Sequence, residues 1–441
     1  MLHPVLQEKL NTAVAPMRPG RSTPRDHRLP EIPGKAHAVV GMRRSGKTTY
    51  LKQLLASRRR SLPAQRAIFL SFEDDRLTGL TSEQLSLLLE EYFRRFPELR
   101  GRENCYWYLD EIQMVSGWER FVRRVLDDEH VEVVVSGSSA RMLSREVHTS
   151  LRGRGMESVI RPFGFREFLR HRGEEPATAP ATWAKEERSL IEKRFREYLD
   201  EGGFPEAQGL DPSLRIELLQ GYVDTVLFRD LIERHGVTQV AALRWVTRHC
   251  LRNPASRFSV HRLYRNLRAE GHAVAKDGVH DMIGHLVDAF LLGTVALATE
   301  SERQRNSNPR KVYPADPGLI GAFDMTGRPN LGHGLESVVF VELERRKAQV
   351  GYVKTPDGFE VDFLARYLDG GEELIQVCAD PSDAETFARE LRALGAARSY
   401  YPRATRRLLV LNRDQVPSAP PAGVVAQPVY EWLMEGTVAA V

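Results

Sequence analysis

The chain has 441 residues, of which 42% are hydrophobic and 28% are charged, and its formal net charge is +4. This length predicts about two to four compact units, and the composition is ordinary for a soluble globular protein. A charge this close to balance excludes a uniformly basic surface, so any surface that binds nucleic acid must be local.

The cysteines and the apolar stretches indicate the cellular compartment in which the protein resides. Cys105, Cys250 and Cys378 are far apart and odd in number, which supports neither a disulfide framework nor a zinc site. The N-terminus lacks the pattern of a signal peptide. The longest apolar stretch, residues 286–298, is interrupted by Asp288 and is shorter than the ~20 residues that span a bilayer. We therefore expect a cytoplasmic protein with no membrane partner.

The first part of the chain predicts an α/β fold. Residues 1–35 contain loop signals and scattered arginines, and we expect a weakly structured lead-in there. From residue 36 to about 160, the apolar runs AHAVVG, AIFLSF, CYWYLD and VEVVVSG alternate with longer stretches of helical spacing. Short apolar strands that alternate with helices indicate a parallel sheet with covered faces.

A phosphate-binding pattern, GxxxxGK[ST], follows the first of these runs. Backbone N–H groups of such a glycine-rich turn point at phosphates where a helix begins. Lys47 would place its charge on the β- and γ-phosphate oxygens, and the Thr48 hydroxyl would ligate Mg²⁺. A chance match is the alternative, and the strand before the turn and the helix after it argue against one. The residues expected to bind nucleotide are Gly41, Met42, Arg43, Arg44, Ser45, Gly46, Lys47, Thr48 and Thr49.

A pair of carboxylates ends the apolar run CYWYLD. Asp110 would hold Mg²⁺, usually through water, and Glu111 would act as the base that orients the attacking water. A surface acidic pair at a strand end is the alternative. The phosphate-binding turn upstream favours the catalytic interpretation.

The run VEVVVSG is followed by serines, where a polar sensor of the γ-phosphate would lie. We assign this role to Ser138, with Ser139 as its competitor, and serine caps of the next helix are an equal alternative. The chain has no NKxD-type motif of the kind that usually accompanies GTP specificity. The expected cofactors are therefore ATP and Mg²⁺.

Several segments resemble a bacterial and archaeal group of AAA-type ATPases: GMRRSGKTTYL, YLDEIQMVSGWERFVRRVLD, VVVSGSSARML, LRGRGMESVIRPFGFREFL and YLDEGGFPEA. The resemblance covers roughly residues 36–412 and implies a winged helix and a C-terminal domain of unknown function. It also implies an arginine finger at Arg154, with Arg152 and Arg161 as competitors. A finger that acts in trans would require a homo-oligomer, and a surface ion pair is the alternative for each arginine.

We divide the rest of the chain into a helical lid at 161–240, a winged helix at 241–325 and a nuclease-like domain at 326–441. The segment FSVHRLYRNLR resembles the first helix of a helix-turn-helix unit, and residues 277–292 would form its recognition helix. A β-hairpin would follow, with basic residues that contact DNA phosphates. These residues are Arg303, Arg305, Arg310 and Lys311. Because the expected recognition helix carries acids and neither Lys nor Arg, a module that binds protein is the alternative.

The order of residues in the last region is similar to the PD-(D/E)xK nuclease core, in which acids and a lysine bind Mg²⁺ and poise water. Asp362 is present, but Gln376 replaces an acid and Cys378 replaces the lysine. We therefore expect a retained fold without cleavage. Metal binding by Glu336, Glu360 and Asp362 is the alternative.

Three functions fit these motifs. The first is an ATP-hydrolysing switch or motor that couples the ATPase core to the winged helix and the tail, on DNA. The second is an ATP-gated regulator that does not hydrolyse ATP and acts on a protein partner. The third is an ATP-dependent nuclease, against which Gln376 and Cys378 argue. We favour the first because Lys47 and Glu111 are both present.

Overall fold

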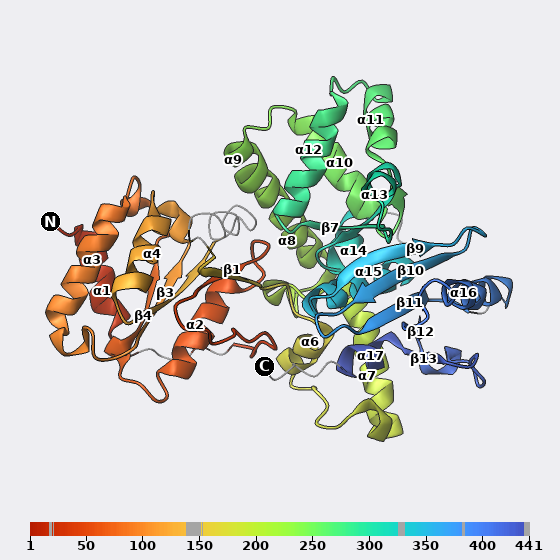
Figure 1. Ribbon diagram of the computed structural model, residues 1–441, viewed down its shortest axis with the longest axis horizontal. Coiled ribbons are helices and arrows are strands. Elements are labelled where there is room, and N and C mark those ends of the chain that lie inside the picture. The colour runs from red at the N-terminus through yellow and green to blue at the C-terminus, as the bar shows by residue number, and fades with distance from the viewer. Residues whose placement is uncertain are drawn as a thin grey trace. The chain divides into compact units, whose positions relative to one another are not determined.

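The computed structural model describes residues 1–16, 20, 22–137, 151, 153–324, 331–381 and 384–435. The chain divides into two compact units, Met1–Arg161 and Pro162–Ala440 (Figure 1). None of the helices in the described ranges is long and apolar enough to cross a membrane.

The first unit alternates strands with helices. Its elements are α1 (Pro4–Ala13), β1 (Ala36–Val40), α2 (Lys47–Arg58), β2 (Ala67–Ser71), α3 (Ser82–Arg95), β3 (Cys105–Asp110), α4 (Trp118–Asp128), β4 (Val131–Ser136) and β5 (Gly155–Val159). The strands form one sheet in the order β2-β3-β4-β1-β5, and every pairing is parallel. The predicted α/β fold with a P-loop type of parallel sheet is confirmed.

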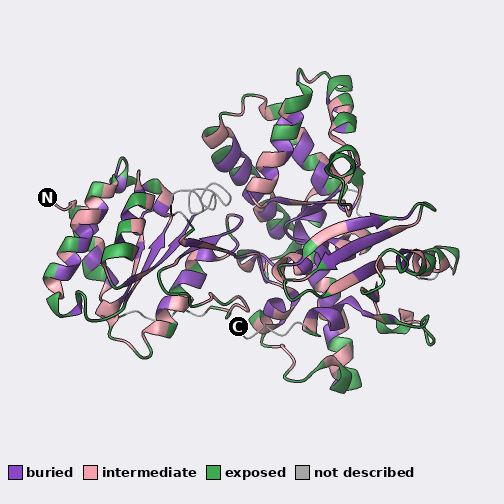
Figure 2. Ribbon diagram, viewed as in Figure 1, coloured by how far each residue is buried: buried purple, intermediate pink, exposed green. Residues whose placement is uncertain are grey.

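Burial explains why these runs form central strands. Every residue of β1 is buried, and so are most residues of β3 and β4, which appear purple in Figure 2. Helix α2 places Tyr50, Leu51 and Leu55 in a core with Val39 and Ile160. Because the strands are parallel, their carboxyl ends share one edge of the sheet, where loops can gather functional residues.

The N-terminal segment is more ordered than its sequence suggested. Residues 4–13 form helix α1, which begins with Pro4 and is capped by the side chain of His3. Leu6 and Leu10, one helical turn apart, are fully buried. The expectation of a weakly structured lead-in is therefore wrong for this helix, because two leucines at this spacing provide an apolar face.

The second unit mixes helices with a larger sheet. Its helices are α6 (Phe165–Arg172), α7 (Lys185–Glu201), α8 (Pro212–Thr225), a π-helix (Val226–Ile232), α9 (Glu233–His235), α10 (Val240–Arg252), α11 (Val260–Ala269), α12 (Lys276–Asp288), α13 (Glu302–Ser307), α14 (Gly318–Phe323), α15 (Leu331–Arg345), α16 (Ala384–Ala397) and α17 (Val429–Glu435). Its strands are β6 (Arg257–Phe258), β7 (Leu292–Leu297), β8 (Arg310–Pro314), β9 (Gln349–Lys354), β10 (Glu360–Arg366), β11 (Glu372–Cys378), β12 (Thr405–Val410) and β13 (Val424–Pro428).

These strands form one mixed sheet in the order β13-β12-β11-β10-β9-β7-β8-β6. The predicted hairpin is present as the antiparallel pair β7 and β8, but helix α13 lies between the two strands where an open basic turn was expected. Strand β7 also pairs in parallel with β9. The hairpin and the C-terminal strands therefore share a sheet, while the boundaries proposed for the lid, the winged helix and the nuclease-like domain stay predictions.

A close backbone contact joins two of the segments that carried the family resemblance. The N–H of Phe163 donates to the carbonyl of Gly203 at 2.6 Å, and a Cβ at residue 203 would lie 2.0 Å from the Phe163 carbonyl oxygen. The Gly203 N–H donates to the buried Asp316 carboxylate at 2.7 Å. Burial raises the pKa of Asp316 to about 7, while its backbone hydrogen bonds oppose that rise. Only glycine fits at residue 203.

We expect Gly203→Ala to destabilise the second unit by about 1–3 kcal/mol or more, because the added methyl group overlaps backbone atoms that cannot move independently. Gly221→Ala is the matched control, since a Cβ there meets no atom within 4 Å. Gly221 lies inside α8, where alanine is favoured over glycine by roughly 0.5–1 kcal/mol. Urea unfolding followed by circular dichroism measures both variants, and equal stabilities would contradict this account.

Candidate functional site

The turn after β1 has the backbone geometry of a phosphate-binding loop. Gly41 has a φ of +144°, and a Cβ at this position would lie 2.1 Å from the Ile160 carbonyl oxygen. Gly46, with a φ of +98°, is the N-cap of α2. Arg44 also has a positive φ, of +66°. The sequence of the loop thus allows a backbone conformation that L side chains rarely adopt, immediately before a helix N-terminus.

The side chains around this loop differ in exposure. Met42, Ser45 and Lys47 are buried. Arg44 and Thr49 are exposed, and Arg43, Gly46 and Thr48 are intermediate. The Lys47 Nζ donates to the carbonyl oxygens of Gly41 and Met42, both at 3.0 Å. The ammonium therefore lies against the inner side of the loop, where phosphate oxygens would accept the same hydrogen bonds.

Asp110, at the end of β3, accepts hydrogen bonds from two hydroxyl groups. The Thr48 Oγ1 lies 3.0 Å from Oδ2 and 3.3 Å from Oδ1 of the carboxylate. The Ser136 hydroxyl, at the end of β4, also donates to Oδ1. Burial raises the pKa of Asp110, and the two hydroxyls and the charge of Lys47 oppose that rise. The expected Mg²⁺ residues, Thr48 and Asp110, are therefore in direct contact.

Glu111 follows Asp110 with a φ of +53°. This left-handed backbone turns the chain at the end of β3, and a short 3₁₀ helix, Ile112–Met114, begins there. The Gln113 Nε2 donates to Oε2 of Glu111. A carboxylate with a side-chain donor beside it is oriented, as a general base needs to be.

Sequence reasoning missed three residues at this site. Ser136 was passed over for Ser138, although it is the hydroxyl residue that ends the strand. Gln113 had no motif role. The Arg25 guanidinium, from the segment before β1, donates to the Ser45 carbonyl at 3.2 Å and to the Arg161 carbonyl. The strand-end position of Ser136 was the usable signal, whereas nothing in the sequence pointed to Arg25.

The sensor and finger assignments are only partly covered by the structure. Ser138, Ser139 and Arg152 lie outside the described residues. Arg154, just before β5, forms an ion pair with Asp127 of the same chain, and both side chains are partly exposed. The assignments of Ser138 and Arg154 stay predictions.

A second polar cluster lies on the sheet of the other unit, around Lys311. Its Nζ lies 2.8 Å from Asp362 Oδ1, 3.0 Å from Glu336 Oε1 and 3.1 Å from Glu360 Oε1. Burial by itself would lower the pKa of the ammonium, but these three carboxylates raise it well above its usual value. The expectation that Lys311 contacts DNA is wrong, because its side chain is only 4% exposed and is held by acids.

This cluster brings together the acids expected of the nuclease-like core, and it adds a lysine. Gln376 on β11 donates to Asp362 Oδ2 at 2.8 Å, and the Val377 N–H donates to the same oxygen at 3.0 Å. Cys378 is buried on the same strand, and burial raises the pKa of its thiol to about 11. An ammonium is thus present after all, but it comes from β8. Within the described residues, no group of three or more His, Cys, Asp or Glu side chains is arranged to hold a metal ion.

We expect Lys311→Met to destabilise the chain by about 3–5 kcal/mol, because it removes the ammonium that three buried or partly buried carboxylates share. Of these acids, Glu360 keeps an ion pair with Arg257, whereas Glu336 and Asp362 have no other cation among the described residues. Lys354→Met is the matched control: Lys354 ends β9 in the same sheet and is exposed. Its substitution should change the free energy of unfolding by no more than about 0.5 kcal/mol. Chemical denaturation measures both, and an equally small effect at Lys311 would show that the cluster does not depend on the ammonium.

Comparison with known proteins places both units in a family. Residues 33–169 match a family model described as an AAA domain, and residues 192–330 match a domain of unknown function. An uncharacterized protein of Methanocaldococcus jannaschii is 31% identical over 375 residues, which are 84% of this chain and 80% of that protein. An uncharacterized protein of Haemophilus influenzae is 27% identical over 333 residues, 75% of this chain and 79% of that protein.

Among solved structures, a Walker-type ATPase of Pyrococcus abyssi matches 65% of this chain and 90% of its own, with 15% identity and a TM-score of 0.42. The family assignment rests instead on the sequence relatives and on the matched domain. The chain belongs to the same family as the Methanocaldococcus jannaschii protein, and its first unit is an AAA domain of the P-loop type.

Proposed function

We propose that the chain is a Mg²⁺-dependent ATPase that uses ATP hydrolysis to change the conformation of its second unit. The observation that carries this proposal is the contact of Thr48 with Asp110 at 3.0 Å, beside Lys47 and Glu111. A hydroxyl and a carboxylate held together in this way can share one Mg²⁺. The AAA domain that matches this part of the chain supports nucleotide binding.

Each side chain has a role that follows from its position. Backbone N–H groups of the loop from Gly41 to Gly46 would bind the phosphates. Lys47 would exchange its two carbonyl partners for oxygens of the β- and γ-phosphates. Bound Mg²⁺ would neutralise charge on those phosphates. Asp110 would accept hydrogen bonds from Mg²⁺-bound water, and Glu111 would take a proton from the attacking water.

Gln113 would keep the Glu111 carboxylate in place between turnovers through its amide hydrogen bond. Ser138 is our proposed sensor of the γ-phosphate. Arg154 is our proposed finger, and it would have to leave Asp127 in order to reach a neighbouring subunit in a homo-oligomer. Release of this exposed ion pair is inexpensive, because such pairs contribute about 0–1 kcal/mol.

We further propose that the switch acts on DNA. The second candidate of the same class is an ATP-gated regulator that does not hydrolyse ATP and acts on a protein partner. The two differ in turnover. Glu111, with the oriented carboxylate of a general base, favours hydrolysis.

Steady-state ATP hydrolysis with Mg²⁺, with and without duplex and single-stranded DNA, tests the proposal. We expect Lys47→Ala to abolish nucleotide binding or turnover. Glu111→Gln should keep ATP bound while its turnover falls by about 10²–10⁴-fold, the usual contribution of a general base. Glu98→Gln, at an exposed acid of the same unit, is the control and should match the wild type.

Each outcome has a distinct meaning. Wild-type turnover in Lys47→Ala would show that this loop is not the nucleotide site. Tight ATP binding without turnover, in the wild type and in Glu111→Gln alike, would favour the non-hydrolysing regulator. Stimulation by DNA that Glu111→Gln abolishes would support a DNA-coupled ATPase.

Metal-dependent nuclease activity is a separate candidate, which Lys311 favours because it supplies the ammonium that Cys378 cannot. The bonds at Asp362 argue against it, since Oδ2 already accepts from Gln376 and from the Val377 N–H. We therefore propose that the domain does not cleave nucleic acid.

A cleavage assay with Mg²⁺ and Mn²⁺, on duplex and single-stranded DNA, tests this statement. We expect no product from the wild type above the level of Asp362→Ala, because a neutral amide at residue 376 weakens metal binding and Lys311 neutralises the acids. Cleavage by the wild type that Asp362→Ala abolishes would overturn it.

A further inference from the structure

One stretch of the second unit contains many basic residues and no acidic ones. Between Glu233 and Glu270 the chain has eight arginines and three histidines, and no aspartate or glutamate. The whole chain is nearly balanced, with 63 Lys and Arg against 59 Asp and Glu. The positive charge is therefore concentrated in helices α10 and α11 and the segments that join them.

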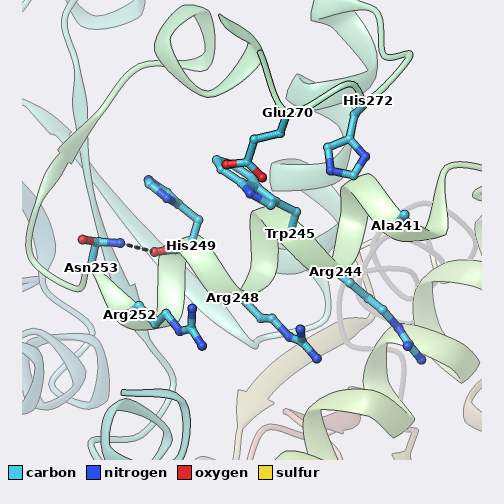
Figure 3. Close-up of a pocket in the computed structure, with 9 residues that line it drawn as sticks. All are labelled: Ala241, Arg244, Trp245, Arg248, His249, Arg252, Asn253, Glu270 and His272. Carbon is cyan, nitrogen blue, oxygen red and sulfur yellow. Dashed lines mark hydrogen bonds between the residues drawn. The ribbon is translucent and has the colours of Figure 1, made fainter. Parts of the chain in front are cut away.

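Three of these arginines form a row on α10. Arg244, Arg248 and Arg252 follow one another at intervals of four residues, and all three are exposed. Residues four apart lie on the same side of a helix, about 6 Å from each other along its axis. Figure 3 shows the three guanidinium groups extending from one side of α10. We call Arg244, Arg248 and Arg252 the arginine face.

The positive charge of the arginine face is only weakly neutralised by other groups of the chain. The pair between Arg244 and Asp224 is long, at 4.0 Å, and its carboxylate is exposed. Arg252 donates to a backbone carbonyl, that of Phe323, at 2.9 Å. Arg248 has no carboxylate within ion-pair distance among the described residues.

Other helices of the same unit differ from α10 in this respect. In α7, Arg194 forms ion pairs with Glu174 at 2.6 Å and with Glu197 at 2.8 Å. Helical arginines are commonly stabilised by acids three or four residues away. On α10 that pattern is missing from the sequence, because the face has no acid on its own helix. The positive charge there remains available to an outside partner.

A hollow of about 590 Å³ adjoins this face. Trp245 and His249 stack with ring centroids 4.9 Å apart, and Figure 3 shows their rings on the side of α10 that faces Glu270 and His272, while the three guanidinium groups extend away from them. Glu270 and His272, from the segment after α11, complete the lining, and Glu270 is the one acid among the lining residues. The same hollow is thus lined by a basic row and by aromatic rings, and proteins that bind single-stranded nucleic acid combine a positively charged groove with aromatic side chains.

The segment expected to contact DNA lacks these features. Arg305 on α13 is paired with Glu302 at 2.7 Å and also donates to the Thr299 carbonyl. Lys311 is buried among three carboxylates. Of the four predicted wing residues, Arg303 is exposed and Arg310 is intermediate. Acids of the same chain therefore neutralise two of the four basic residues of the hairpin, Arg305 and Lys311.

We propose that the arginine face of α10 binds the phosphodiester backbone of a nucleic acid. Arginines about 6 Å apart match successive phosphates of one strand, which lie farther apart than the axial rise of about 3.4 Å per nucleotide because the backbone winds around the helix axis. Contacts of this kind position the protein without reading sequence. The proposal rests on the DNA-directed action proposed above, and it names the surface that would carry it.

Binding of a labelled oligonucleotide to the full chain, followed by fluorescence anisotropy over a range of salt concentrations and without nucleotide, tests the proposal. The test variant carries Arg244→Ala, Arg248→Ala and Arg252→Ala, since alanine preserves the helix. A matched variant carries Arg303→Ala, Arg305→Ala and Arg310→Ala and loses the same charge. A third variant replaces the arginine face with lysines and keeps the charge.

We expect the arginine-face variant to bind at least about tenfold more weakly. Its slope of log affinity against log salt should fall by about 2.7 on duplex DNA, or about 2.1 on a single strand, because three phosphate contacts are lost. The variant with lysines should keep most of the affinity, and the matched variant should resemble the wild type. Separate measurements with duplex DNA, single-stranded DNA and single-stranded RNA distinguish the source of the phosphates.

Three results would overturn the proposal: no binding by the wild type, equal losses in the two alanine variants, or competition by polyglutamate as effective as by unlabelled DNA. The last would mark a general surface for acidic polymers. Basal ATP turnover of the arginine-face variant should equal that of the wild type. If nucleic-acid binding fails, the ATPase proposal still stands. If the wild type shows no ATP turnover, the binding result still stands, because it is measured without nucleotide.

Discussion

The hydrogen bonds at Asp110 tie together segments that are distant in sequence. Thr48 is 62 residues from Asp110, and Ser136 is 26 residues from it, yet both hydroxyls contact the same carboxylate. The sheet order makes this contact possible, since β4 lies between β1 and β3 and all three are parallel. The same hydroxyls oppose the rise in pKa that burial causes, so they favour the ionised form of the carboxylate.

The arrangement of residues at the candidate nucleotide site was largely predictable because its signals are local. A glycine-rich turn between a strand and a helix, followed by an acidic pair at a strand end, can be recognised both by its residues and by the elements that flank it. Lys47, Thr48 and Asp110 lie at the positions in the fold that these signals predicted. Ser136 was missed because the search for a sensor moved past the end of the strand. Helix α1 was missed because its apolar face consists of a few residues, Leu6 and Leu10 among them, inside a segment otherwise rich in loop signals.

The second unit was harder to predict because its polar groups meet through long-range pairing. A nuclease motif places its lysine near the acid on the same strand, where this chain has Cys378. The ammonium instead comes from Lys311, which is 51 residues from Asp362. No local pattern reports such a contact, and Lys311 was counted with the exposed basic residues of a hairpin. The net charge of the chain also gave no sign of the arginines gathered on α10 and α11, because acids elsewhere in the chain balance their positive charge.

The pairing of β7 with β9 has a consequence for how the chain can be divided. Strand β8 hydrogen-bonds to β7, and β7 hydrogen-bonds to β9. This continuous sheet holds Lys311 of β8 close to the acids of α15 and β10. A truncation near residue 325 would expose the edge of β9 and would remove the only ammonium that the described residues place among those acids. The isolated C-terminal fragment would then be prone to self-association through its open strand edge. The boundary between the two compact units lies instead between Arg161 and Pro162, and a fragment that begins there keeps the sheet of the second unit intact.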